Sequence, residues 1–517
     1  MFGTSGIRGP VGDVVTARFA LDLGRAVGAD TETVIVGRDA RVTGEVLADA
    51  VSAGLREFGV DVVRLGVVST PTLARSVQWL SADAGVGVTA SHNPAPDNGI
   101  KLWNPSGQAF TPEQTDEIER RLSTLGVEPG VSVEDTDAEP STADTDAKLS
   151  ADIEPASWDE FGKERVDDQV STRHVDRLVE ALSGSRASEG DRSDEHSAVK
   201  SSNDASSKLL SGLSIVVDLG NGTGRVTVDA LHELGATVHT LDAQRDGRFP
   251  ARKSEPNADT LTALRSAVPA LDADFGVAHD GDADRMVAVT GGGNFVPGDL
   301  LLALFARDAV ESEFARDAVE SEFARDAVES SDPSARSFSP SVAVPVDTSL
   351  VVADTVATSG GSVEYTPVGD VHVADVASQD GFVFGGEPSG AWIWPEQTLA
   401  PDGHYAALHL ATLVAANESL ETLLDAVSDA EYVTRRANVE ADNKAEAMSA
   451  IERVLRERHD DIDTIDGLRV DTGDGWFLVR PSGTEPLVRV TAEARDEERA
   501  DDILNSALDV VKTEANP

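Results

Sequence analysis

Two short segments hold the residue types that could do chemistry together. The segment 89–94 reads TASHNP and sets one serine, Ser91, beside a histidine. The segment 280–285 reads DGDADR and sets three aspartates at alternate positions, namely Asp280, Asp282 and Asp284. Carboxylate oxygens are the ligands that Mg²⁺ prefers, and a serine hydroxyl can carry a phosphoryl group. The two segments together predict a phosphoserine enzyme with a Mg²⁺ site.

The aspartate segment has two other interpretations. It could be solvated surface in a very acidic protein, or the start of an EF-hand loop, which also begins with three alternating acidic positions. An EF-hand requires Gly next and Glu at the twelfth position, whereas this chain has Arg285 and Gly291 there. The EF-hand interpretation therefore fails, and the solvated loop stays as the alternative.

Three further motifs lie in a fixed order around these two. The chain starts with FGTSGIRG (2–9), and EPSG (387–390) and RPSGTEP (480–486) follow the aspartates. Taken together, the five motifs resemble those of the α-D-phosphohexomutase family, which includes phosphoglucomutases, phosphomannomutases and phosphoglucosamine mutases. The resemblance covers nearly the whole chain except its acidic and repeated insertions, and it suggests an archaeal, halophile-like member.

The resemblance implies both a fold and an activity. The implied fold is α/β: three similar mixed α/β domains followed by a smaller α+β C-terminal domain around a central cleft. The implied activity is an isomerase reaction, in which an intramolecular phosphotransferase interconverts hexose 1-phosphate and 6-phosphate. Its partner is a small-molecule sugar phosphate, and its cofactors are Mg²⁺ and hexose 1,6-bisphosphate, which serves as activator and intermediate.

The resemblance also assigns roles around the serine. Ser91 carries the phosphate and completes the Mg²⁺ shell of the three aspartates, and the other catalytic candidates are Arg8, His92, Lys101 and Arg285. Lys101 ends the segment DNGIK (97–101) and is the leading candidate for general acid or base. His92 could instead be a packed histidine, and Arg8 and Lys101 could be surface charges.

Two later loops would hold the sugar phosphate. Glu387, Ser389 and Gly390 would bind sugar hydroxyls, since a carboxylate accepts two hydroxyl protons and glycine lets the backbone approach. The alternative is a simple turn, and Ala391 departs from relatives that often have histidine there. The non-reacting phosphate would bind in a cradle of guanidinium, hydroxyl and backbone N–H groups, formed by Arg480, Ser482, Gly483 and Thr484.

The substrate preference is less constrained. The compact start and the sugar loop resemble archaeal phosphoglucosamine mutases, which favours glucosamine phosphate. Glucose and mannose phosphates stay as alternatives.

Alternating helix and strand signals divide the chain. The first α/β domain (1–126) contains predicted helices at 16–27 and 44–58 and predicted strands at 33–36, 60–65 and 86–88. Ser91 therefore follows the carboxyl end of the last of these strands. Open α/β sheets bind ligands at that edge. The other predicted segments are an acidic linker or insertion (127–168), a metal-loop α/β domain (169–296, acidic insertion 183–208), a sugar-loop α/β domain (297–410, repeat insertion 305–340) and a C-terminal α+β domain (418–517).

A nonapeptide, FARDAVESE, recurs almost three times from Phe305, Phe314 and Phe323. Nine residues turn a helix by about 900°, so successive copies face opposite sides and form no continuous apolar stripe. The repeat therefore extends a helix or loop and is no solenoid.

Composition excludes several classes of protein. The chain has 517 residues, 43 Lys and Arg against 92 Asp and Glu, and a net charge of −49, which disfavours nucleic acid and anionic membranes as partners. The acidic residues are spread throughout, as in a halophilic protein whose self-repulsion is screened by salt. There is no cysteine, hence no disulfide or thiol nucleophile. No apolar leader or membrane span is evident, so we expect a soluble, cytoplasmic protein, and no oligomeric state is predicted.

Two alternative functions belong to other classes of protein than the phosphohexomutases. GNGTG (220–224) follows a predicted strand as a dinucleotide-binding loop would, but Arg225 stands where the third glycine is needed. A tight turn between strand and helix explains this loop better than an NAD-dependent oxidoreductase does. A non-catalytic sugar-phosphate-binding protein is the second rival, although it would need neither Ser91 nor a catalytic metal.

Overall fold

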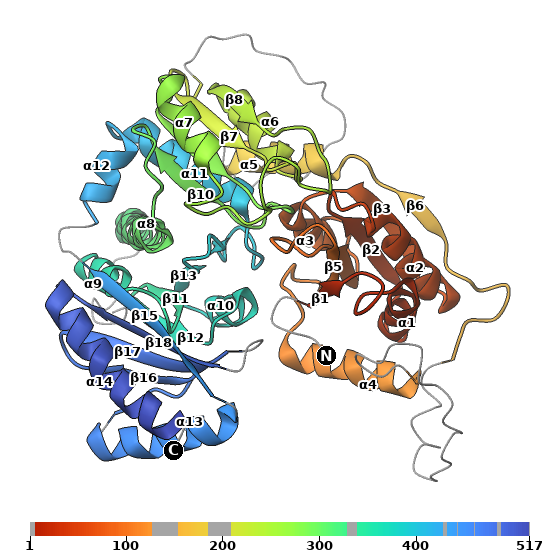
Figure 1. The fold of residues 1–517 in the computed structure, drawn as a ribbon. Helices are drawn as coiled ribbons and strands as arrows, with labels where there is room; N and C mark the ends of the chain where they lie inside the picture. Colours follow the sequence, from red (N-terminus) through yellow and green to blue (C-terminus); the bar gives the residue numbers. More distant parts are fainter. Residues whose placement is uncertain are drawn as a thin grey trace. The chain divides into compact units, whose positions relative to one another are not determined.

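The computed structural model describes residues 6–126, 154–184, 208–327, 339–427, 432–441, 443–459, 461–482 and 487–515 (Figure 1). For residues 317–327 it describes the backbone alone. The chain divides into two compact units, the first formed by Met1–Val296 with Thr398–Thr422 and the second by Pro297–Gln397 with Leu423–Pro517. Both units consist of mixed α/β layers, as the sequence predicted.

The first unit begins with a six-stranded sheet in the order β1-β5-β4-β2-β3-β6. Its strands are β1 (Ile7–Pro10), β2 (Thr33–Arg38), β3 (Asp61–Val67), β4 (Ala84–Val88), β5 (Asp97–Trp103) and β6 (Glu164–Val166). Its helices are α1 (Ala17–Gly28), α2 (Gly44–Glu57), α3 (Thr70–Trp79) and α4 (Pro112–Thr124). Strand β5 runs antiparallel to both of its neighbours, β1 and β4. Residues 89–96 therefore form the return between two adjacent strands.

Alternation along the central strands explains why this sheet is covered on both faces. Val34 and Val36 of β2 join one core cluster with side chains of α1, α2 and α4. Successive side chains of a strand point to opposite faces, so Ile35 points the other way. On that face a side chain at Gly85 would meet Ile35 together with Leu73 and Val77 of α3. Both faces are apolar, which leaves the loops at the strand ends to carry the polar chemistry.

The second sheet of the first unit has the order β10-β9-β7-β8. Its strands are β7 (Ser214–Asp218), β8 (Thr237–Leu241), β9 (Phe275–Ala278) and β10 (Val287–Thr290). The helices are α5 (Val170–Leu182), α6 (Arg225–Leu234), α7 (Thr262–Ala270) and α11 (Gly403–Ala416). Helix α11 comes from far along the chain and packs on α5 and α6. The loop 279–286 connects β9 to its antiparallel neighbour β10 and carries the three aspartates.

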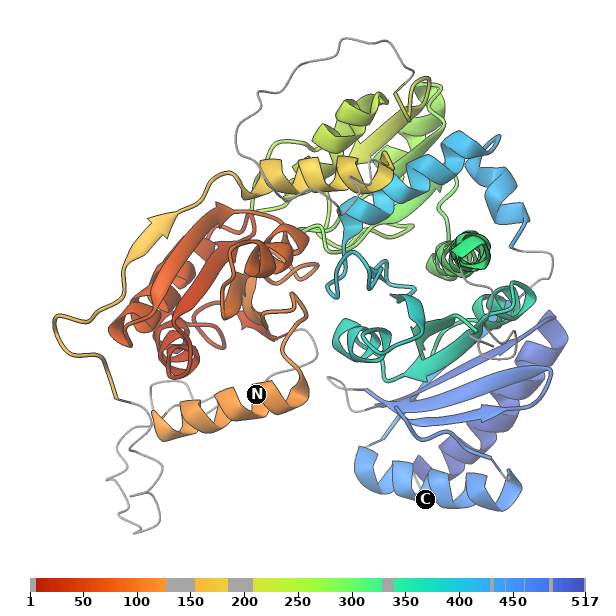
Figure 2. The same ribbon diagram turned by 180° about the vertical axis from the view of Figure 1, so that it is seen from behind.

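The second unit contains two four-stranded sheets, in the orders β12-β11-β13-β14 and β15-β18-β17-β16. The strands are β11 (Ser341–Pro345), β12 (Ser362–Thr366), β13 (Phe382–Gly386), β14 (Trp392–Ile393), β15 (Val433–Glu440), β16 (Leu468–Asp471), β17 (Gly475–Pro481) and β18 (Leu487–Ala494). The helices are α8 (Gly298–Ala327), α9 (Leu350–Thr358), α10 (Asp370–Ala377), α12 (Leu420–Asp425), α13 (Lys444–Arg458) and α14 (Glu497–Ala515); α12 straddles the division between the units. Figure 2 shows α13 and α14 lying together against the C-terminal sheet, where they bury its apolar core.

Most of the predicted elements form where the sequence placed them. The predicted helices at 16–27 and 44–58 correspond to α1 and α2, and the predicted strand at 86–88 corresponds to the end of β4. The nonapeptide repeats up to Ala327 continue the long helix α8. Residues 301–306 of this helix are buried, and exposed positions begin at Glu311, which agrees with a repeat that lacks an apolar stripe.

Several predictions fall partly outside the described residues. The acidic segments 127–153 and 185–207 and the end of the repeat region, 328–338, belong to this group. Strand β6 lies inside the predicted linker 127–168. The domain boundaries stay predictions. Among the described residues, no helix is long and apolar enough to span a membrane.

Candidate active site

The loop after β4 holds Ser91 in an unusual backbone conformation. Ser91 has φ +46°, in the left-handed region that side chains other than glycine rarely adopt. Its carbonyl accepts hydrogen bonds from the Arg41 guanidinium and from the Ser254 hydroxyl, both at 2.8 Å. Its backbone N–H donates to the Thr89 hydroxyl at 2.9 Å. The surroundings therefore hold a strained residue in place, as is common at functional sites.

Arg41 organises the whole loop. Its side chain is fully buried and donates to the carbonyls of Ser91, Asn93, Pro94 and Asp97 at 2.7 to 2.9 Å. The remaining N–H, on Nε, donates to Asp39 at 3.1 Å. All five N–H donors of the guanidinium are thus used. The charge of Arg41 is balanced by Asp39, and its fork fixes the path of the chain around Ser91.

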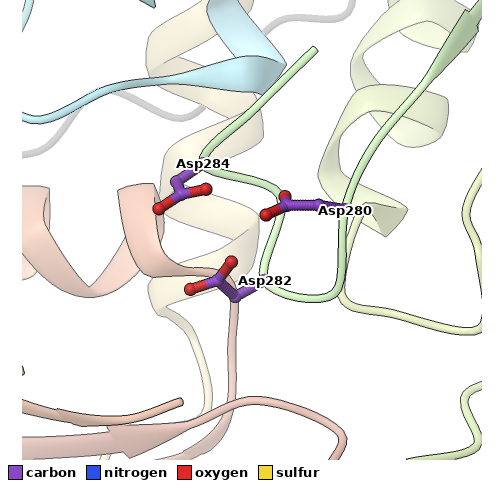
Figure 3. Close-up of side chains that lie close together, drawn as sticks. All are labelled: Asp280, Asp282 and Asp284. Atoms are coloured by element: carbon purple, nitrogen blue, oxygen red, sulfur yellow. The ribbon is translucent and has the colours of Figure 1, made fainter. Parts of the chain in front are cut away.

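The Ser91 hydroxyl faces the aspartate loop (Figure 3 shows the three carboxylates). It donates to Asp280 at 2.5 Å, and Asp284 lies 3.5 Å away. Asp280, Asp282 and Asp284 are buried, and each offers one oxygen such that these oxygens all lie within 4.8 Å of one another. The structure thus brings together the serine and the three aspartates that the sequence singled out, and the solvated-loop alternative does not fit their burial.

The donor set suits a hard divalent cation. Asp282 accepts hydrogen bonds from the hydroxyls of Thr70 and Thr89 on Oδ2, whereas its buried Oδ1 accepts none from any residue that the structure describes. A buried carboxylate oxygen without a partner is costly. A cation held by the three carboxylates removes this cost. Mg²⁺, with its preference for oxygen ligands, fits the site.

Electrostatics lead to the same conclusion. Burial, together with the neighbouring Asp282, raises the pKa of Asp280 to about 6 and raises the pKa of Asp284 well above its usual range. Three ionised carboxylates without a counter-charge repel one another in a desolvated site. A bound cation reverses these shifts because it favours the ionised form of each ligand.

The four predicted cationic or imidazole side chains surround the serine loop. His92 Nδ1 lies 3.4 Å from the Ser91 hydroxyl, and burial together with the charges of Arg285 and Arg8 lowers the pKa of His92 to about 3. Lys101 is buried and its charge lowers the pKa of Asp284. Arg8 Nε is buried without a hydrogen-bond partner among the described residues. Lys101 is therefore not a surface charge, whereas Arg8 is half-buried with its Nε atom inside.

The predicted sugar loop lies in the second unit, between β13 and β14. Glu387 is buried and accepts hydrogen bonds from the Gly369 backbone N–H at 2.8 Å and the Ser389 hydroxyl at 3.1 Å. Gly390 has φ +100°, and its N–H donates to the carbonyl of Glu387 at 3.0 Å. The loop is a tight turn that holds one carboxylate, and sugar binding by this loop stays a prediction.

The predicted phosphate cradle lies at the end of β17, also in the second unit. Arg480 pairs with Asp466 at 2.8 Å, and Ser482 is buried. Gly483 and Thr484 lie outside the described residues. A cavity of about 220 Å³ opens beside Arg480 and Ser482, and two further arginines line it, Arg436 and Arg489.

The glycine-rich loop of the dinucleotide alternative faces the metal loop. It connects β7 to α6, and a side chain at Gly222 would lie 2.5 Å from the carbonyl of Gly281. Glycine is needed at Gly222 because the aspartate loop approaches the backbone there. Arg252 covers Gly220 and pairs with Asp218 at 3.1 Å. The loop is a close-packed turn between strand and helix, which is the interpretation that its glycine spacing favoured over a dinucleotide-binding loop.

Comparison with known proteins assigns the family. Four domain profiles of phosphoglucomutase/phosphomannomutase match in order: α/β/α domain I at residues 1–126, domain II at 195–293, domain III at 297–430 and the C-terminal domain at 436–510. The chain belongs to the phosphoglucomutase/phosphomannomutase family. It is a phosphohexomutase, an intramolecular phosphotransferase, and the resemblance carried by the five motifs is confirmed.

Individual relatives extend over the whole chain. A probable phosphoglucosamine mutase of Methanopyrus kandleri is 41% identical over 99% of this chain and 97% of its own length. Another, of Methanococcoides burtonii, is 37% identical over the full length of both chains. The crystal structure of a phosphoglucomutase/phosphomannomutase family protein of Burkholderia thailandensis matches with a TM-score of 0.74 at 25% identity, covering 100% of this chain and 99% of the other.

Sequence reasoning missed several residues that this phosphohexomutase places around its chemistry. Arg41, Thr70, Thr89 and Ser254 hold the serine and the aspartates through hydrogen bonds from distant segments. No motif marks Arg41, Thr70 or Ser254, because such residues are common in loops, and Thr89 lies in the TASHNP segment without a role of its own having been predicted. Arg489, by contrast, closely follows the RPSGTEP segment, and that position could have drawn attention.

Proposed function

We propose that this phosphohexomutase interconverts glucosamine 1-phosphate and glucosamine 6-phosphate through a phosphorylated Ser91. The observation that carries the proposal is the 2.5 Å hydrogen bond from the Ser91 hydroxyl to Asp280, inside a cluster of three buried aspartates. This hydrogen bond supports Ser91 as the residue that carries the phosphate beside a divalent cation. Mg²⁺, when bound there, neutralises charge on the transferring phosphoryl group.

The reaction consists of two phosphoryl transfers. In the first, the P–O bond of phospho-Ser91 breaks while phosphorus bonds to the free hydroxyl oxygen of the substrate, which gives a hexose 1,6-bisphosphate. The hydroxyl proton passes to a general base, and the Ser91 oxygen takes up a proton. After the bisphosphate reorients, the second transfer returns its other phosphate to Ser91 by the reverse sequence of bond changes.

The neighbouring residues have distinct roles in this proposal. Lys101, buried and close enough to Asp284 to lower its pKa, is the general acid and base. His92 has a pKa of about 3 and stays neutral near neutral pH, so it orients the Ser91 oxygen by a hydrogen bond. Arg8 and Arg285 supply positive charge to the equatorial oxygens of the phosphoryl group, where phosphoryl transfer needs it.

The non-reacting end of the substrate would be bound by the second unit. Glu387, held by Gly369 and Ser389, accepts hydrogen bonds from sugar hydroxyls. The cavity beside Arg480 and Ser482 would take the non-reacting phosphate. Its two additional arginines, Arg436 and Arg489, strengthen this assignment because a dianion needs more positive charge than Arg480, which is paired with Asp466, supplies alone.

The choice of glucosamine phosphate rests on the relatives. The two compared in full length are each named probable phosphoglucosamine mutase. Glucose and mannose phosphates are the competing substrates within the family. A non-catalytic sugar-phosphate-binding protein is disfavoured because such a protein has no use for a serine hydrogen-bonded into a cluster of carboxylates.

A coupled mutase assay tests the proposal. The wild-type protein is assayed in high salt with Mg²⁺ and a trace of hexose 1,6-bisphosphate, on the 1-phosphates of glucosamine, glucose and mannose. We expect the highest kcat/KM with glucosamine 1-phosphate. Ser91→Ala removes the phosphate carrier and abolishes turnover, whereas Ser123→Ala, an exposed serine of α4, leaves it unchanged.

Three outcomes contradict the proposal in different ways. Turnover that survives in Ser91→Ala refutes the phosphoserine mechanism, and a higher kcat/KM with glucose or mannose 1-phosphate corrects the substrate alone. Tight binding of a sugar phosphate without turnover of any of the three supports the binding-protein alternative. Mass spectrometry of the wild-type protein gives an independent readout, an added phosphate located on Ser91.

A further inference from the structure

A chain of buried hydroxyl and imidazole groups runs behind the aspartate loop 279–286 (the metal loop), within the first unit. Seven contacts connect the carbonyl of Arg285 to His279, His279 to Thr227, Thr227 to His404, His404 to Ser69, Ser69 to Thr72, Thr72 to His174, and His174 to Asp402. Every side chain between these two ends is buried. We call this set the histidine chain.

The histidine chain touches the metal loop at two points. One end is the backbone carbonyl of Arg285, the residue after Asp284. In the middle, Ser69 precedes Thr70, whose hydroxyl donates to Asp282 at 2.6 Å and whose backbone N–H donates to the Asp282 carbonyl at 2.9 Å. Helix α11 contributes His404 and, at its N-cap, Asp402. The first residue of the helix, Gly403, also packs on the loop backbone, where a side chain would lie 2.4 Å from the Arg285 carbonyl.

The direction of the hydrogen bonds follows from the carbonyl end. A carbonyl can only accept, so His279 donates to Arg285 through Nδ1–H at 2.8 Å. A neutral imidazole has a single N–H, which makes His279 Nε2 an acceptor for the Thr227 hydroxyl. With its proton used there, Thr227 accepts from His404 Nδ1–H at 2.8 Å. His404 Nε2 then accepts from the Ser69 hydroxyl.

Neutral histidines agree with their surroundings. Burial lowers the pKa of His174 and of His404. The imidazole rings of His404 and His174 lie 5.4 Å apart, as do those of His404 and His279, so that two charges in this row would repel. At one end of the histidine chain, the ionised Asp402 carboxylate pairs with Arg75, with 2.8 Å between Nε and Oδ2. The other groups of the histidine chain are uncharged.

A proton count gives an internal check on this direction. Three neutral imidazoles and three hydroxyls supply six protons, one for each group, and there are seven contacts. One contact therefore lacks a proton. Starting from the carbonyl, the six protons cover every contact up to His174 Nδ1, and the contact between His174 Nε2 and Asp402 is left without one. That contact is 3.3 Å, the longest of the seven.

We propose that Thr227 and His404 are positioning residues of the metal loop, which act by holding His279 in the tautomer that donates to the Arg285 carbonyl. Neither residue touches a proposed metal ligand or the Ser91 hydroxyl. Residues that orient a metal-binding loop in this way typically affect metal affinity or activity by about 10- to 100-fold. The inference rests on the proposed metal role of the three aspartates.

Thr227→Val is the most direct test because it replaces the hydroxyl by a methyl group and keeps the shape. Ring ¹⁵N resonances of metal-free, histidine-labelled protein report the tautomers, with assignments from His279→Gln and His404→Gln. In the wild-type protein we expect both rings to carry the proton on Nδ1. In Thr227→Val, His279 Nε2 loses its hydrogen-bond donor, so the ring is no longer held in the Nδ1-protonated tautomer. His404 loses its acceptor, and its proton moves to Nε2, from which it donates to Ser69.

Function is followed by Mn²⁺ affinity and by kinetics. Thr227→Val weakens Mn²⁺ binding and lowers kcat by about 10- to 100-fold, with little change in the KM for sugar phosphate. Thr227→Ser keeps the hydroxyl and stays close to the wild-type protein. Val228→Ala, a buried apolar truncation on the same helix, lowers thermal stability without changing either the tautomers or the Mn²⁺ affinity.

The outcomes separate this inference from the proposed function. The proposed function is contradicted if the wild-type protein binds no Mn²⁺ and the Ser91→Ala variant keeps its turnover. In that case the tautomers still test the hydrogen bonds of the histidine chain. A functional wild-type protein whose Thr227→Val variant keeps its Mn²⁺ affinity and kcat within twofold refutes the positioning role. An Nε2-protonated His404 in the wild-type protein refutes the assigned direction.

Discussion

Arg41→Lys tests whether the serine loop depends on a guanidinium fork or on positive charge alone. Arg41 is fully buried, and its five N–H groups donate to four loop carbonyls and to Asp39. Lysine keeps the charge that balances Asp39 but has only three donors on one nitrogen. At least two of the five hydrogen bonds are therefore lost, and their carbonyls stay buried.

The expected magnitude follows from these bonds. A hydrogen bond from a charged donor contributes about 1.5 to 3 kcal/mol, so two of them, partly replaced by water, amount to about 3 kcal/mol. In a domain of about 150 to 250 residues, each kcal/mol lowers the midpoint of thermal unfolding by about 2 to 4 °C, which predicts a shift of about 6 to 12 °C. The loop also releases Ser91, and a misplacement of about 1 Å lowers kcat by about 100-fold.

Calorimetry and the coupled mutase assay measure the two effects. Arg121→Lys is the matched control, because Arg121 donates to the Ala26 carbonyl and to the more exposed Asp30 and Glu117. Such partners contribute about 1 kcal/mol or less, so the control shifts the midpoint by only a few degrees and leaves kcat unchanged. If Arg41→Lys behaves like Arg121→Lys in both assays, the argument from the five donors is refuted.

Two further predictions concern ion binding and pH. Mg²⁺ at about 100 times its dissociation constant should raise the free energy of unfolding of the first unit by about 2.7 kcal/mol, and Asp282→Asn should remove most of this gain in a thermal titration. Equal stabilisation of both proteins would contradict the assigned site. Burial raises the pKa of Asp299 to about 6 from an ordinary 3.8, so the folded state binds the proton more tightly than the unfolded state. The stability that Asp299 contributes is thus fully present below about pH 4 and falls by up to about 3 kcal/mol as the pH rises through 6. Asp299→Asn, which keeps an acceptor for the Ser349 N–H, should flatten the dependence of the unfolding midpoint on pH between 4 and 6.5, and an unchanged slope would argue against burial as the cause.

The family and most of the local structure could be read from the sequence. Strand signals located β2 and the end of β4, helical signals located α1 and α2, and TASHNP after β4 placed Ser91 at a strand's carboxyl end. These features are local, because residues a few positions apart settle them. The identity of the chemical groups was also evident, because the chain carries both a TASHNP segment with Ser91 and a DGDADR segment with three alternating aspartates.

Tertiary structure alone decided how these groups meet and what holds them. The Ser91 hydroxyl and Asp280 are 189 positions apart in the chain, and His404 and Ser69 are 335 apart. Arg41 carries no motif, yet its fork fixes the serine loop, and His404 lies in an ordinary apolar helix. Periodicity reports which side of an element is apolar, whereas a hydrogen bond between distant segments exists only after both have packed. The sequence by itself therefore determined the chemistry that this protein has available, and the packing of α3, α6 and α11 decided how that chemistry is positioned.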